Sequence, residues 1–178
     1  MSGHSKWSKV KHQKALTDTA KGSAFTKASR AITVAVHEGG GITDPNGNFR
    51  LRLAIEGARA VNMPKETIQR AIDKGRGAGE GAIEQVIYEA YGPGGVGMLI
   101  EAATDNRNRT VSVIKNVFER FGGSLASPGA VSFLFTRSGT TMKPLTVMDL
   151  SPEQRTRIDA LVAELEALDD VQRVYTNV

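Results

Sequence analysis

The sequence predicts an α+β protein in which an N-terminal three-helix domain precedes an α/β sandwich of mostly antiparallel strands with helices on one face. Up to residue 75, apolar residues recur at three- and four-residue steps, which is the period of helices. Beyond residue 82, short runs rich in valine and isoleucine alternate with helical segments. A glycine-rich segment at 76–81 separates the two patterns, and we expect it to be a linker between domains 1–75 and 82–178.

The first domain is expected to begin with a flexible arm at residues 1–13, which lack a regular apolar spacing. A helix follows and ends at the glycines of 39–41, and residues 44–47 have the composition of a turn. A second helix leads to a third, which starts at Pro64 because proline is favoured at the first helical position, and ends at Gly75. The residues expected to face inward are Phe25, Ala28, Ile32, Ala35, Val36, Leu51, Ala54, Ile55, Ala58, Ile68, Ala71 and Ile72.

The second domain is expected to follow the order β-β-α-β-α-β. Its predicted strands are residues 86–88, 96–100, 131–135 and 171–175, and a tight turn at 91–95 joins the first two. The spacing of Val111, Ile114 and Phe118 predicts the first helix, which the glycines at 122–123 end. The second helix begins at Ser151, since serine followed by proline is a common helix start.

The bulk composition is that of an ordinary globular protein, with 178 residues, 40% hydrophobic and 24% charged. No apolar run approaches the ~18 residues of a membrane span, and the polar, basic start does not resemble a secretory signal. Cysteine is absent, which excludes disulfides, thiol nucleophiles and cysteine-ligated zinc and fits a reducing compartment. We therefore expect a cytoplasmic protein without a membrane partner.

Charge is distributed unevenly along the chain. Residues 1–80 carry 14 basic and 7 acidic side chains, whereas residues 81–178 carry 9 and 12, so the net charges are +7 and −3. A basic end on a nearly neutral body favours a polyanionic partner such as nucleic acid. The alternative reading is a solvated tail, since basic patches are common on protein surfaces.

The sequence contains no recognisable catalytic or cofactor site. There is no Walker-type phosphate loop, and His4, His12 and His37 lack the spacing of metal ligands. The glycines at 39–41 and 92–95 suit helix ends and turns more readily than a phosphate cradle. Asp169 and Asp170 suit a cation or, more simply, the turn that ends a helix. We expect no enzyme activity, no cofactor and no metal.

Two segments are candidates for nucleic-acid binding. Trp7, the only tryptophan, lies among Lys6, Lys9 and Lys11, a combination that suits base stacking with backbone neutralisation; alternatively the indole anchors the arm on the helical domain. Residues 105–110, Asp-Asn-Arg-Asn-Arg-Thr, either cap a helix or take a phosphate between two guanidinium groups. The candidate binding residues are Lys6, Trp7, Lys9, Lys11, His12, Lys14, Lys21, Lys27, Arg30, Arg50, Arg52, Arg107 and Arg109.

Several motifs resemble the YebC/PmpR family over nearly the whole chain. They include Met1-Ser-Gly-His-Ser-Lys-Trp7, Leu51-Arg-Leu-Ala-Ile55, Asn62-Met-Pro-Lys65, Tyr91-Gly-Pro-Gly-Gly95, the run at 105–110 and Leu168-Asp-Asp-Val-Gln172. The resemblance implies a DNA-binding regulator of transcription. It also implies an alternative, a ribosome- or RNA-associated factor that eases translation of difficult sequences such as proline runs, since mitochondrial relatives are translational activators.

One departure from the family pattern concerns the connection at 136–150. Family members usually carry a third lobe between the strand matching residues 131–135 and the helix matching residues 151–168. Only 15 residues bridge that gap here. We therefore expect the third lobe to be missing. Three classes of function remain open at this point: a DNA regulator, a ribosome or structured-RNA factor, and a protein-interaction module.

Overall fold

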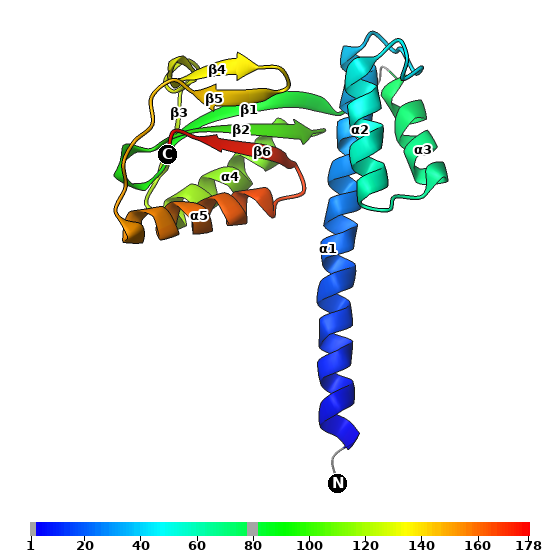
Figure 1. Cartoon of the computed structure of the whole chain (residues 1–178), viewed down its shortest axis with the longest axis horizontal. Coiled ribbons are helices and arrows are strands. Elements are labelled where there is room, and N and C mark those ends of the chain that lie inside the picture. Colours follow the sequence, from blue (N-terminus) through cyan, green and yellow to red (C-terminus); the bar gives the residue numbers. More distant parts are fainter. Residues whose placement is uncertain (1–2, 78–81) are drawn as a thin grey trace. The chain divides into compact units, whose positions relative to one another are not determined.

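The computed structural model describes residues 3–77 and 82–178, with side chains described from residue 21 onward (Figure 1). The chain divides into two compact units, Met1–Ala78 and Gly79–Val178, each with its own buried core. Part of the expected linker, residues 78–81, lies outside the described residues. Within the described part, no helix is both long and apolar enough to span a lipid bilayer.

The first unit consists of three helices: α1 (Gly3–Glu38), α2 (Phe49–Ala60) and α3 (Lys65–Gly75). The expectation of a flexible arm at residues 1–13 is wrong for the backbone, because α1 is helical from Gly3 onward. Apolar spacing gave no sign of this part of the helix. Residues 3–13 include three lysines and one glutamine, which favour helices, and they continue a helix that α2 and α3 anchor further along.

The core of the first unit forms where α2 and α3 pack against the last turns of α1. Ile32 and Val36 of α1 meet Leu51 and Ile55 of α2 and Ile72 of α3, all of them buried as expected. Gly75 ends α3 as predicted, and a side chain there would lie 2.7 Å from the Cβ atom of Val36. The glycine therefore permits the close approach of α1 and α3.

The connections of the first unit agree with the sequence in outline. The Gly47 N–H donates to the Asp44 carbonyl over 3.0 Å, which confirms the turn at 44–47. Asn48, which was not among the predicted caps, is the N-cap of α2: its side chain accepts a hydrogen bond from the Leu51 N–H and donates to the Ala35 carbonyl over 2.8 Å. Pro64 is the N-cap of α3, so that helix starts one residue later than expected.

The second unit contains a four-stranded antiparallel sheet in the order β3-β1-β2-β6. Its strands are β1 (Glu84–Tyr91), β2 (Gly97–Thr104), β3 (Ser124–Ala126) and β6 (Val171–Thr176). The short 3-10 helix η1 (Pro93–Gly95) turns the chain between β1 and β2. Helices α4 (Arg107–Phe121) and α5 (Pro152–Glu166) lie on one face of the sheet (Figure 1). The α+β class is therefore confirmed.

The other face of this sheet is covered by a segment whose structure was predicted less accurately from the sequence. It consists of the 3-10 helix η2 (Ser132–Leu134) and the hairpin β4 (Phe135–Ser138) and β5 (Thr141–Pro144). The strand predicted at 131–135 is wrong. Val131 and Phe135 are buried against Leu99 of β2, as apolar strand residues would be, but the backbone between them forms a turn.

The carboxylate of Glu89 in β1 explains why residues 131–135 do not form a strand. Its two oxygens accept hydrogen bonds from the backbone N–H groups of Gly129, Val131 and Ser132, at 2.7, 2.6 and 2.9 Å. Those donors are therefore not available to a neighbouring strand. Burial raises the pKa of the Glu89 carboxyl, but the three N–H donors lower it further, so the pKa lies below its ordinary value of 4.5.

We predict that Glu89→Gln destabilises the second unit by about 2 kcal/mol at neutral pH, because hydrogen bonds to a buried charged group are lost or weakened. Since the folded-state pKa is depressed, this contribution is complete above the unfolded pKa and is lost as the pH falls through the folded value. Urea unfolding followed by circular dichroism should show the difference at pH 7 and a smaller one near pH 3. The exposed Glu119→Gln serves as control, and equal losses for both variants would contradict the assignment.

Candidate nucleic-acid interface

Most of the predicted cations lie on α1. Lys6, Trp7, Lys9, Lys11, His12 and Lys14 belong to the helical backbone, although their side chains lie outside the described residues. Lys21 is exposed, and Lys27 and Arg30 are half-buried and already interact with other groups of the chain. The helix therefore joins all nine predicted residues of this segment into one continuous element.

The helical register relates Trp7, which the sequence placed in a flexible arm, to cations further along α1. Positions 7, 14 and 21 are two turns apart, so Trp7, Lys14 and Lys21 share one side of the α1 backbone. Helices α2 and α3 lie beside the later part of α1, whereas its first half extends past both of them (Figure 1). Within the first unit, the first half of α1 thus has no neighbouring helix.

The two predicted arginines of α2 have different partners. Arg50 forms an ion pair with Glu38 at the end of α1. Arg52 places its guanidinium over the ring of Phe49, 5.1 Å from the centroid, which is within the range of a cation–π interaction. In the described part of the chain, Arg52 forms no ion pair with a carboxylate. Of these two arginines, only Arg50 has its charge balanced by a neighbouring acid.

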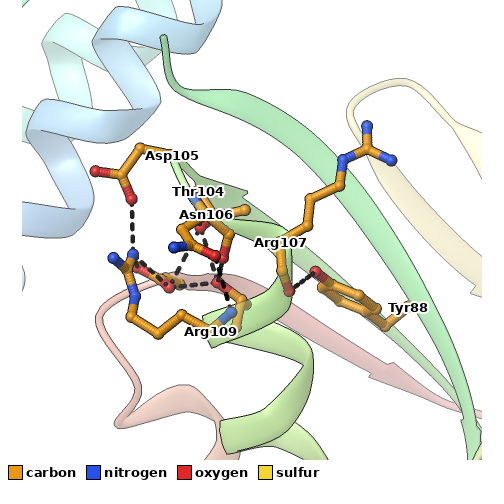
Figure 2. A network of polar contacts seen from close by, with 8 residues as sticks. Tyr88, Thr104, Asp105, Asn106, Arg107 and Arg109 are labelled. Atoms are coloured by element: carbon orange, nitrogen blue, oxygen red, sulfur yellow. Dashed lines mark hydrogen bonds and ion pairs between the residues drawn. The ribbon is translucent and has the colours of Figure 1, made fainter. Parts of the chain in front are cut away.

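The run at 105–110 forms the start of α4 (Figure 2). The Asn106 side chain accepts a hydrogen bond from the Arg109 N–H over 3.0 Å, so capping by Asn106 is confirmed. Arg107 donates through two nitrogens to the carboxylate of Glu84 in β1. This hydrogen-bonded pair lowers the pKa of the Glu84 carboxyl.

Arg109 and Thr110 join this helix start to the residue preceding β6. The Arg109 guanidinium lies 2.7 Å from an oxygen of Asp105 and 3.1 Å from one of Asp170. The buried hydroxyl of Thr110 donates to the same Asp170 carboxylate over 2.5 Å. Thr104 connects to the network by accepting a hydrogen bond from the Asn106 N–H over 2.9 Å (Figure 2).

This network brings together two motifs that are 60 residues apart in sequence. Asp170, which the sequence offered as a cation ligand or a turn residue, accepts from Arg109 and Thr110. No group of three or more potential metal ligands occurs among the described residues. A phosphate at this helix start would compete with carboxylates already bound to Arg107 and Arg109, so phosphate binding there stays a prediction.

We predict that Asp170→Asn lowers the free energy of unfolding of the second unit by about 2 kcal/mol, because two donors to a carboxylate that is only 13% exposed are weakened. Thermal unfolding followed by circular dichroism measures this. Asp159→Asn, at an exposed position on α5, is the matched control and should unfold like the unmodified chain. Identical melting of both variants would show that the network does not stabilise the unit.

These features define a two-unit α+β protein with a basic helical first unit. Its sequence matches two family models, the TACO1/YebC protein N-terminal domain over residues 5–78 and the TACO1/YebC second and third domain over residues 83–141 and 137–178. The chain belongs to the TACO1/YebC family. The two segments matched by the second model overlap at residues 137–141, and the absence of a lobe at 136–150 stays a prediction.

The chain is also similar to individual proteins. It is 48% identical to a protein of Roseiflexus castenholzii, over 99% of this chain and 71% of that protein, and 50% identical to one of Chlorobaculum parvum, over 99% and 69%. Both are named probable transcriptional regulatory protein. The crystal structure of a conserved hypothetical protein of Aquifex aeolicus superposes with a TM-score of 0.79 at 34% identity, over 88% of this chain and 89% of that one.

Proposed function

We propose that this chain is a non-catalytic regulator that binds nucleic acid, with DNA and the regulation of transcription as the first candidate. The observation that carries the proposal is the net charge of +7 on residues 1–80 against −3 on the remainder, with half of the basic residues of 1–80 on one long helix. The names of the similar proteins support the regulatory part. The absence of cysteine suits a cytoplasmic site of action.

In this proposal the phosphates are bound mainly by the first unit. The proposed contacts are Lys6, Lys9, Lys11, Lys14, Lys21, Lys27, Arg30, Arg50 and Arg52, with Trp7 and His12 against exposed bases. The second unit, joined through the linker proposed at 76–81, contributes Arg107 and Arg109 to the nucleic acid or to a protein partner. No bond is made or broken.

A second candidate is a ribosome- or RNA-associated factor that eases translation of difficult sequences. The sole tryptophan favours it, because Trp7 shares a side of α1 with Lys14 and Lys21. An aromatic beside cations suits unpaired bases of RNA better than the edges of paired bases in a duplex. Co-sedimentation with ribosomal particles distinguishes this candidate from a factor that prefers duplex promoter fragments over random duplex.

We predict that Trp7 fluorescence changes when duplex DNA or structured RNA is added to the full chain at low salt. Because Trp7 is the only tryptophan, the signal reports on the first turns of α1. Raising the salt concentration should reverse the change steeply, since counterions released from the nucleic acid dominate such binding.

The control for this titration is a combined charge reversal, Lys9→Glu, Lys11→Glu and Lys14→Glu, which keeps Trp7 in place. We expect this variant to lose at least about tenfold in affinity, because three cation–phosphate contacts become repulsive. Unchanged affinity of the variant for every DNA and RNA tested would contradict the proposed function. Circular dichroism should show the same helix content for both proteins.

A further inference from the structure

Helix α2 has an unusual outer face. Leu51, Ile55 and Ala58 point into the core, as in any helix packed on one side. The opposite side carries Phe49, Leu53, Gly57 and Ala60, at steps of four, four and three residues, and we call these four residues the α2 ridge. Phe49 is 57% exposed and Leu53 38%. Surface helices normally place polar residues at the centre of this side. The α2 ridge is apolar and lies opposite the core, so packing of the core does not explain it.

Gly57 is a second unexplained feature of the same ridge. A glycine within a helix weakens it relative to alanine. A Cβ atom at position 57 would meet no other atom within 4 Å, so packing within the fold does not require the glycine. Its small size does leave room for another molecule to approach the helix closely.

The position of the Phe49 ring is set by the cap of the helix. Phe49 is the first residue of α2, directly after Asn48, which is buried and bonded to both Ala35 and Leu51. This anchor fixes the backbone from which the ring projects outward. Arg52, one turn further, covers part of the ring with its guanidinium at 5.1 Å.

The charges around the ridge favour one kind of ligand. Arg50 and Arg52 flank Phe49, and Arg59 lies two turns beyond Arg52 on the same side; Glu56 is the acidic residue of this face. Unlike Arg50, Arg52 has no carboxylate partner in the described part of the chain. An exposed aromatic ring with an available cation suits a nucleobase attached to a phosphate, and the unit that carries it has the excess of positive charge.

We propose that Phe49 and Arg52 form a stacking platform on which an unpaired nucleobase of a single strand binds, with Arg52 contacting the adjoining phosphate. This inference rests on the proposed nucleic-acid binding and adds to it a site and a preference for unpaired bases. A base inside a duplex already stacks on both neighbours and is not available to the ring. The platform therefore responds to single-stranded segments of either RNA or DNA.

The test uses the full chain and short oligonucleotides that contain 2-aminopurine, whose fluorescence falls on stacking, as single-stranded RNA, single-stranded DNA and duplex. Phe49→Ala is expected to weaken single-strand binding about tenfold and duplex binding less than about twofold. Phe49→Trp should keep the affinity and the quenching, whereas Phe49→Leu should lose both. The matched control is Phe133→Ala, which removes a ring that is 66% exposed in the second unit and should change nothing.

Salt dependence separates the two residues of the platform. Phe49→Ala removes no charge and should leave the slope of log affinity against log salt unchanged. Arg52→Gln should reduce the magnitude of that slope by about 0.7 on single strands, as expected for one phosphate contact. The RNA and DNA arms show which kind of strand is preferred.

Two results distinguish failure of this inference from failure of the proposed function. If the unmodified chain binds oligonucleotides but Phe49→Ala or Phe49→Leu binds them equally well, the platform is refuted while nucleic-acid binding stands. The same result is expected if the α2 ridge docks on a protein surface. If the unmodified chain binds no oligonucleotide at low salt, the proposed function and the platform both fail.

Discussion

The pairing of arginines with carboxylates determines which cations of this chain meet a polyanion without first losing a partner. In the second unit Arg107, Arg109 and Arg120 each contact an acidic side chain. The first unit holds an excess of basic residues, and Arg52 rests on an aromatic ring instead of an acid. A nucleic acid that approaches Arg52 therefore displaces no carboxylate of the described residues, whereas one that approaches Arg107 or Arg109 at the start of α4 competes with the carboxylates bound there.

Two acidic residues of the second unit form hydrogen bonds that join loop or turn segments to its strands and helices. Glu89 binds three backbone N–H groups of the turn before β4, and Asp170 binds Thr110 and Arg109 at the start of α4. Glu89 thereby provides acceptors for backbone N–H groups that no strand pairs, and Asp170 provides an acceptor for two side-chain donors at the helix start. Of the two, the sequence offered only Asp170 as a candidate cation ligand, and its carboxylate instead accepts hydrogen bonds from Arg109 and Thr110. The second unit thus uses these acids to hold its own segments together, while the excess of positive charge lies in the first.

Helices and the main strands were predictable because one buried face repeats along each of them, as the inward residues of α2 and α3 show. The turn at 132–134 was not predictable, since the apolar residues around it have the spacing of a strand. The hydrogen bond from the Val131 N–H to Glu89 joins residues that are 42 positions apart in the sequence. The helical start of α1 escaped prediction because its residues carry no regular apolar spacing. For the candidate site, the charge asymmetry was visible in composition. The pairing of Arg109 with Asp170 and the exposure of Phe49 depend on three-dimensional packing and leave no local signal.

One measurement tests directly whether nucleic acid binds the first unit or the second. The full chain, bound to RNA or single-stranded DNA that carries photoreactive thio-bases, is irradiated, and the cross-linked peptides are identified by mass spectrometry. The structure and the charge distribution predict cross-links in α1 and α2, with few in α4 or before β6. Cross-links confined to residues 104–110 and 168–172 would contradict the account, because the carboxylate-paired arginines would then be the binding surface.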